Sequence, residues 1–318
     1  MRKSMVALAA VALFTACDGN PFSTADTASS TTSTTTTTAS TIPATISNNL
    51  STFTYDPVAQ TVSVAISGLD STPTSVAYTR NLAAEAGLPA GYEAYSIQED
   101  ALDRLFVAVA RQSADGSVRA GVASDGGQFN RFFSGAHYER TGDFTPPTIG
   151  TGPGAGQVSY AGGYVGLDNW SGPNPTLPAG ADPSLQMSGP GRVTGNVFIN
   201  ANFSDMQLNG SVFNRRAIDL VTVANPTGTP LANLILIPGS IGADGTFSGD
   251  IELQSGTITD IGDYAGIFGG TDAASLGGAL VVTNFLDGID TESETGIFVL
   301  TQCGMTGADA VLCAGPAP

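Results

Sequence analysis

The run from Tyr264 to Val282, YAGIFGGTDAASLGGALVV, interrupts apolar residues with five glycines. A glycine inside a strand loses backbone entropy and packs no side chain, so such glycines mark bulges, corners or close approaches between backbones. Phe268 lies between Gly266 and Gly270, and Phe247 is flanked by glycines in the same way. This spacing predicts a small barrel in which glycines on neighbouring strands leave room for aromatic rings inside.

Period-two alternation of apolar and polar residues recurs along the chain. In Arg192–Ser204 and Gly245–Leu253 the apolar residues share one side, as in strands buried on one face and wet on the other. Eight segments of this kind follow one another at 158–167, 192–203, 207–216, 231–238, 245–254, 263–269, 277–285 and 296–303. They predict an eight-stranded antiparallel up-and-down barrel over residues 157–303.

Residues 51–143 predict a smaller N-terminal β-sheet domain, so the expected fold class is all-β. This region holds six or seven short strand segments, among them Thr61–Ser67, with Asp-Gly pairs that suit hairpin turns. The segment 144–156 is rich in proline and glycine, and we expect it to link the two domains.

Helix signals in this region are local. Asn81 can cap a short helix that Gly87 and Pro89 would end. Ser96–Phe106 has the spacing of a capping box, but we assign it to two strands with a turn at Glu99–Asp103.

The N-terminus has the layout of a secretory signal. Arg2 and Lys3 precede an apolar stretch from Met5 to Phe14, which is too short to span a bilayer as a mature helix. Small residues lie just before Cys17, as in a bacterial lipobox. We expect residues 1–16 to be removed as a signal peptide and Cys17 to be lipidated. Plain secretion with a free cysteine is the alternative.

Residues 17–50 are rich in serine and threonine and have almost no apolar surface to bury. This composition predicts a disordered tether, which would hold the folded part away from a lipid membrane bound through acylated Cys17. The predicted location is the outer membrane of a bacterial cell, with the protein facing either the periplasm or the exterior. Alternatively, residues 17–50 are a low-complexity linker without an anchoring role.

The formal net charge of −17 argues against nucleic acid as a partner, because an acidic protein repels phosphate backbones. A transmembrane barrel is also disfavoured. Its lipid face would need continuous apolar belts, whereas Asn, Asp, Thr and Arg occupy one face of these strands.

The chain has three cysteines, and lipidation of Cys17 leaves Cys303 and Cys313. In an oxidising compartment we expect these two to form a disulfide that closes the C-terminal tail, residues 304–318. The alternative is that Cys303 and Cys313 bind a metal or form a redox pair, but the sequence has no further cysteine or histidine ligands near them.

The glycine-rich run resembles the barrel domain shared by transferrin-binding protein B and related surface lipoproteins of Gram-negative bacteria. The residues that match its motif are Gly266, Phe268, Gly270, Ala273, Gly277 and Gly278. Ser275 replaces a glutamate that is frequent in the family. The resemblance covers residues 157–303, about half of the chain.

This resemblance implies an eight-stranded barrel beside a smaller, handle-like β domain in an exported lipoprotein. Members of the family capture transferrin, haem or haemoglobin, or complement regulators, and some pass iron or haem to an outer-membrane transporter. Their contact residues lie on variable loops, so none can be transferred to positions in this chain.

Two residues are candidate ligand contacts. His137, the one histidine, could ligate haem iron with Tyr138 or Tyr160, although it also reads as an ordinary polar residue on a strand. Trp170 begins a proline-rich loop after the first barrel strand. It is either an exposed partner contact or a cover over the open end of the barrel.

For the other conspicuous polar groups, we predict roles in the fold and not in binding or catalysis. The acidic stretch Asp287–Glu294 could gather oxygens for calcium, but it lacks an EF-hand pattern and reads as a solvated hairpin loop. Arg215 and Arg216 are adjacent on a strand, so they point to opposite faces. No G-x-S-x-G motif accompanies His137, and we expect neither an enzyme nor a metal site.

The sequence thus supports three hypotheses of function. The first is a non-enzymatic envelope lipoprotein that binds an iron- or haem-carrying protein, or haem itself, through barrel and handle loops. The second is a surface coat or interaction protein without a role in iron capture. A hydrolase hidden in the loops is the third and the least favoured.

Overall fold

The computed structural model describes residues 37–38, 42–68, 75–98, 104–125, 132–152, 154–170, 189–254, 260–286 and 291–314. Residues Thr35–Pro318 form one compact unit. The predicted signal peptide and Cys17 lie outside the described residues.

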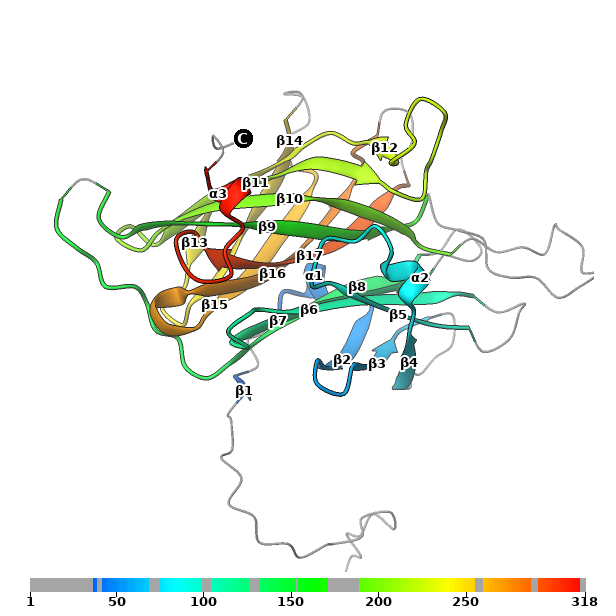
Figure 1. Cartoon of the computed structure of the whole chain (residues 1–318), viewed down its shortest axis with the longest axis horizontal. Helices are drawn as coiled ribbons and strands as arrows, with labels where there is room; N and C mark the ends of the chain where they lie inside the picture. Colours follow the sequence, from blue (N-terminus) through cyan, green and yellow to red (C-terminus); the bar gives the residue numbers. More distant parts are fainter. Residues whose placement is uncertain are drawn as a thin grey trace, which may run out of the picture. The chain divides into compact units, whose positions relative to one another are not determined.

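The second half of the chain forms a closed antiparallel barrel, as predicted. Its eight strands are β9 (Gln157–Asp168), β10 (Gly191–Asn202), β11 (Gln207–Ala217), β13 (Leu234–Ile241), β14 (Thr246–Leu253), β15 (Gly262–Gly269), β16 (Ser275–Thr283) and β17 (Ser293–Gln302). Each pairs with its neighbour in chain order, and pairing between β9 and β17 closes the barrel. The two-residue strand β12 (Thr229–Pro230) pairs antiparallel with the end of β11. Figure 1 shows these strands in green to red.

The first half forms a second antiparallel sheet, also as predicted. Its strands are β1 (Thr37–Thr38), β2 (Leu50–Asp56), β3 (Thr61–Ile66), β4 (Val76–Arg80), β5 (Glu93–Ile97), β6 (Phe106–Gln112), β7 (Val118–Asp125) and β8 (Ser134–Thr141). Strands β2 to β8 follow chain order across the sheet, and β1 pairs with the outer edge of β8.

The helices are short. They are α1 (Ala44–Ser47), α2 (Leu82–Glu85) and α3 (Ala310–Ala314), with a 3-10 turn, η2, at Thr271–Ala273. The predicted cap of α2 is present, because the Asn81 side chain accepts a hydrogen bond from the amide of Ala84 at 3.0 Å. No helix of the described residues is long and apolar enough to cross a membrane.

Aromatic and aliphatic side chains fill the barrel. Phe268 is fully buried, with its ring centroid 5.0 Å from that of Phe203 and 5.1 Å from that of Phe247. Tyr160 also packs against Phe268, with 5.5 Å between the ring centroids. Phe144, from the predicted linker, also packs against this cluster. An eight-stranded barrel is just wide enough to be filled in this way.

The outer face of β15, β16 and β17 carries a second core that is shared with strands β6, β7 and β8. It includes Ala265, Ile267, Ala279, Ile297 and Val299 from the barrel, with Val107, Val109, Val118, Val122 and Tyr138 from the other sheet. These barrel strands are therefore buried on both faces. In β10 and β14, by contrast, buried residues alternate with less buried ones, as the alternation in their sequences predicts.

Candidate functional site

Two glycines of the barrel motif make room for aromatic rings inside. Gly266 lies opposite Phe247, and a Cβ atom on Gly266 would come within 2.3 Å of the Phe247 ring. Gly278 lies opposite Phe298, whose ring would be 2.6 Å from an added Cβ atom. Without these glycines the rings could not occupy the interior.

Two other glycines of the motif face the second sheet. A Cβ atom on Gly270 would lie 2.4 Å from a carboxylate oxygen of Asp115, and one on Gly277 would lie 3.4 Å from Val118. Ser275, at the position of the family's frequent glutamate, is buried beside the same Asp115. The motif therefore also joins the barrel to the turn between β6 and β7.

The motif residue Ala273 ends the turn between β15 and β16. Its amide donates to the carbonyl of Thr145 at 2.8 Å, and its carbonyl accepts the hydroxyl of Tyr160 at 2.6 Å. Ala273 is fully buried, with a positive φ of 53°. A larger side chain would have no space at this end of the barrel.

We predict that Gly266→Ala lowers the free energy of unfolding by about 2–3 kcal/mol, the cost of overpacking a closed core. The added methyl group would meet both the Phe247 ring and the carbonyl oxygen of Gly277, which is 2.4 Å away and cannot rotate aside. Gly277→Ala is the matched control, because its methyl group would meet only ordinary contacts. Urea unfolding of both variants would measure the difference, and equal losses would contradict the steric explanation.

An ion pair is buried at the other end of the barrel. Arg215 donates to the Glu294 carboxylate at 2.6 Å, and both side chains are fully buried. The Tyr164 hydroxyl donates to the second oxygen of the same carboxylate at 2.6 Å. Glu292 is buried as well, at 2% exposure. The reading of this acidic stretch as a solvated loop is thus wrong for Glu292 and Glu294, and Asp287 and Asp290 lie outside the described residues.

Trp170 is half-buried and packs against the barrel core. Its backbone amide donates to the side chain of Asp168 at 2.9 Å, which fixes the turn after β9. This is the packing of a residue that covers the barrel end. A role of Trp170 in ligand binding stays a prediction.

His137 lies on β8, on the face of the second sheet away from the barrel. Its ring stacks on Phe53 with 6.3 Å between centroids, and its Nε2 atom is 3.9 Å from the Glu139 carboxylate. The cavity beside it holds about 10 Å³. Tyr138 points to the opposite face and Tyr160 lies inside the barrel, so neither shares a cavity with His137. Haem ligation by His137 also stays a prediction.

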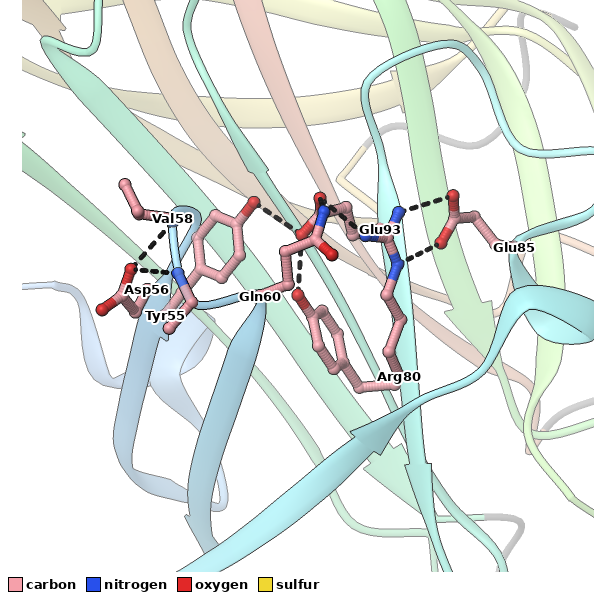
Figure 2. Close-up of polar contacts among 9 residues, drawn as sticks. Tyr55, Asp56, Val58, Gln60, Arg80, Glu85 and Glu93 are labelled. Carbon is pink, nitrogen blue, oxygen red and sulfur yellow. Dashed lines mark hydrogen bonds and ion pairs between the residues drawn. The ribbon is translucent and has the colours of Figure 1, made fainter.

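A polar cluster on the second sheet was missed in the sequence. Figure 2 shows the Glu93 carboxylate at its centre, with Arg80, Gln60 and Tyr55 around it. Glu93 accepts the hydroxyls of Tyr55 and Tyr95 at 3.0 and 2.6 Å and the Gln60 amide at 3.2 Å, and Arg80 lies 3.3 Å away. Burial, followed by this carboxylate, raises the pKa of both tyrosines. Because the carboxylate is already fully bonded, the cluster ties β2, β4 and β5 together and has no capacity left for a ligand.

A disulfide joins Cys303 and Cys313 across ten residues. It closes the tail that carries α3, which lies against β9 (Figure 1). The amide of Cys303 donates to the carbonyl of Ser159 at 2.7 Å, so the loop starts from the barrel wall.

We predict that replacing both cysteines by serine lowers the free energy of unfolding by about 2–3 kcal/mol, the value for a loop of this length in the chain-entropy model. Thermal unfolding of Cys303→Ser/Cys313→Ser would test this. Reduced wild-type protein is the control and should unfold at the same temperature as the variant. A variant as stable as the oxidised protein would show that the tail contributes nothing.

A groove of about 810 Å³ opens on the outer wall of the barrel, beside this disulfide. Its polar lining comes from the start of β9, the end of β10 and the start of β11. The residues concerned are Gln157, Ser159, Asn200, Asn202, Gln207 and Asn209. In β10 and β11 these outward residues alternate with buried ones such as Ile199 and Leu208, which face the barrel core. The outer wall is therefore polar here because the strand period is two.

A break in strand register shapes the groove. Strands β11 and β13 lose their regular pairing between Leu208 and Gly210, and β13 and β14 lose theirs between Leu236 and Ser240. Pro238 lies in this break and lines the groove. From inside the barrel the Tyr264 hydroxyl donates to the carbonyl of Ile237 at 2.6 Å. The wall thus bulges at this point while its backbone stays hydrogen-bonded from within.

No protein-family model matches the sequence, and no curated protein matches it either. Among solved structures, the chain is similar in fold to a double mutant of transferrin-binding protein B (TbpB) from Haemophilus parasuis. The identity is 14% and the TM-score 0.38, over 78% of this chain and 52% of that chain.

Two further TbpB structures are similar. Intact Ap-TbpB, with N and C lobes, has 15% identity and a TM-score of 0.36 over 78% of this chain and 53% of that chain. Isotype 1 TbpB from serogroup B Neisseria meningitidis has 16% identity and a TM-score of 0.34 over 68% of this chain and 36% of that chain. The chain spans about half the length of these proteins or less, and similarity at this level concerns the fold alone.

Proposed function

We propose that this chain is a non-enzymatic, lipid-anchored protein of the bacterial envelope that binds a ligand on its outer surface. The packed barrel interior carries this proposal. Phe268, Tyr264 and Leu280 are among the side chains fully buried inside, so a ligand has to bind to the outer wall or the loops. The signal-like N-terminus, the lipobox at Cys17 and the polar tether support an anchor that presents this surface away from the membrane.

The glycine motif supports a finer proposal for the ligand. By its resemblance to the transferrin-binding protein B barrel, the ligand is an iron- or haem-carrying protein, or haem, that is passed to an outer-membrane transporter. Haem at His137 would have to lie on the surface, because the cavity there is about 10 Å³. The second candidate is a surface coat or interaction protein. It is supported by the polar clusters around Glu93 and Glu294, whose side chains bond to one another within the fold.

Labelling of cells with a radioactive or clickable fatty acid tests the anchor. We expect the wild-type chain to be labelled and Cys17→Ser to be unlabelled. Protease treatment of intact cells then tests the location, since loss of the chain without cell lysis marks the cell surface. An unlabelled wild-type chain in the culture medium would overturn the lipid-anchored proposal in favour of plain secretion.

Titration with haem separates the iron-capture proposal from the coat proposal in part. Haem ligated by His137 should give a Soret shift that His137→Ala abolishes. Trp170→Ala, which changes a residue just after β9 of the barrel, is the control and should leave the Soret band at the wild-type wavelength. The absence of a shift with the wild-type chain would remove the haem version. Capture of an iron-carrying protein from growth medium by the immobilised full chain would test the protein version.

A further inference from the structure

We infer that the groove on the outer wall of the barrel is a binding site for a neutral oligosaccharide. This inference rests on the proposed function and names the ligand class for one surface. The groove volume of about 810 Å³ lies within the range of roughly 300–1,000 Å³ typical of small-molecule sites. It is bordered by paired strands and a disulfide, so the side chains on its wall stand on a rigid frame.

The groove wall is lined by amides that have free hydrogen-bonding capacity. Asn200 and Asn209 lie directly opposite each other on β10 and β11, and both are exposed. The Asn200 side-chain oxygen accepts the Ser159 hydroxyl at 2.7 Å, which orients the exposed amide. Each amide offers a donor and an acceptor. Sugar hydroxyls offer the same pair, so a row of amides matches a row of hydroxyls.

The charge of the groove excludes anionic ligands. Asp205 is the one charged side chain among the described residues that line it. It is held in place by the Asn202 amide at 2.9 Å. A carboxylate at the rim and a net charge of −17 over the whole chain would repel sulfated, phosphorylated or carboxylated ligands. A neutral ligand is favoured.

The backbone of the groove wall argues against a peptide as the occupant. A peptide binds to a sheet by adding a strand to an open edge, or it inserts side chains into apolar pockets. Strand β10 is paired on both sides along Asn200–Asn202, with β9 and with β11. Apart from Gly154, Val158, Pro238 and Cys303, the exposed lining is polar. Pro238 is exposed and offers a small apolar surface against which the CH face of a sugar ring can pack.

The inference can be tested with the purified full chain and an array of neutral oligosaccharides, among them glucans, mannans and galactans of six or seven units. Binding to at least one sugar is expected and would be measured by titration calorimetry. The double variant Asn200→Ala/Asn209→Ala should weaken it by about 10-fold or more, because two amide contacts are lost. Asn196→Ala, on the same face of β10 outside the groove, is the matched control and should bind as the wild type does.

Three outcomes would overturn the inference. They are binding to no neutral sugar on the array, equal binding by the double variant and the wild type, and binding only to dextran sulfate or to an immobilised peptide library. Circular dichroism of each variant would show that it is folded. Failure of sugar binding in a chain that is lipid-labelled and protease-accessible would leave the proposed function intact. Sugar binding by a chain that takes up no fatty acid label in cells would instead overturn only the proposal of a lipid anchor.

Discussion

Above about pH 10 this protein is expected to lose stability steeply and to unfold in one step. All eight tyrosines are buried, with residue exposures of 7% or less. Burial is the largest cause that raises the pKa of each one above the ordinary value of 10.0. The folded protein therefore keeps its phenol protons at a pH where the unfolded chain releases them.

The direction follows from proton linkage. Since the folded pKa values are raised, the stability from these tyrosines is fully present below pH 10 and is lost as the pH rises above it. Each tyrosine contributes about 1.4 kcal/mol per pH unit, so eight give a slope of up to roughly 11 kcal/mol per pH unit. A domain with a free energy of unfolding of about 5–15 kcal/mol would then unfold about one pH unit above 10.

Absorbance at 295 nm and near-ultraviolet circular dichroism, recorded on the same samples, would check this prediction. Phenolate absorbance should rise together with the loss of the dichroism signal, at one pH midpoint. Tyr138→Phe is a suitable variant, because its midpoint should move to higher pH when one proton fewer is released. Phenolate absorbance that rises near pH 10 while the dichroism is unchanged would mean that the tyrosines are accessible in the folded protein.

The strands of the barrel could be predicted closely because their alternation follows directly from the pleat. Predicted segments 192–203 and 207–216 match β10 and β11 within one residue at each end. The segment 231–238 was placed three residues too early. Leu231 is apolar because it packs at the barrel end, and the strand β13 itself begins at Leu234. In the sequence, an apolar residue that packs just before a strand cannot be distinguished from an apolar residue of the strand itself.

Contacts between distant strands could not be predicted. Gly277 and Gly278 are consecutive on one strand and must point to opposite faces, but nothing in the sequence shows that the outward Gly277 meets Val118 of the second sheet. The groove on the outer wall had a partial signal, since Asn196, Asn200 and Asn202 share the polar face of one strand. Its hollow shape depends on the register break at Pro238, which the alternation of β13 alone does not reveal.

Arg215→Met is expected to lower the free energy of unfolding by about 3–5 kcal/mol, the usual cost of leaving a buried charge without its partner. Besides Glu294, the guanidinium donates to the carbonyl of Ala232 at 2.6 Å and lies 5.4 Å from the Phe285 ring. Removing it would leave the Glu294 carboxylate with only the Tyr164 hydroxyl as a side-chain partner among the described residues.

Arg216→Met is the matched control for this prediction. Arg216 is the next residue on β11, points to the outer face, is half-buried and donates to the carbonyl of Gly228 at 3.1 Å. Its loss should cost about 1 kcal/mol or less. Urea unfolding followed by the fluorescence of Trp170, the one tryptophan, would compare the two variants. If Arg215→Met and Arg216→Met lose the same free energy of unfolding, the buried Arg215–Glu294 pair contributes no more stability than the hydrogen bond of Arg216.

The double variant Arg215→Met/Glu294→Gln separates the cost of an unpaired charge from the value of the pair itself. Removing both charges leaves neither side of this pair as an unpartnered buried ion, and the Tyr164 hydroxyl can still donate to the glutamine carbonyl. We therefore expect the double variant to be more stable than Arg215→Met alone, because an ion pair in a barrel core gives up hydration that its attraction only partly recovers. If instead the double variant is the less stable of the two, the Arg215–Glu294 pair stabilises the barrel in its own right and the desolvation argument is wrong for this site.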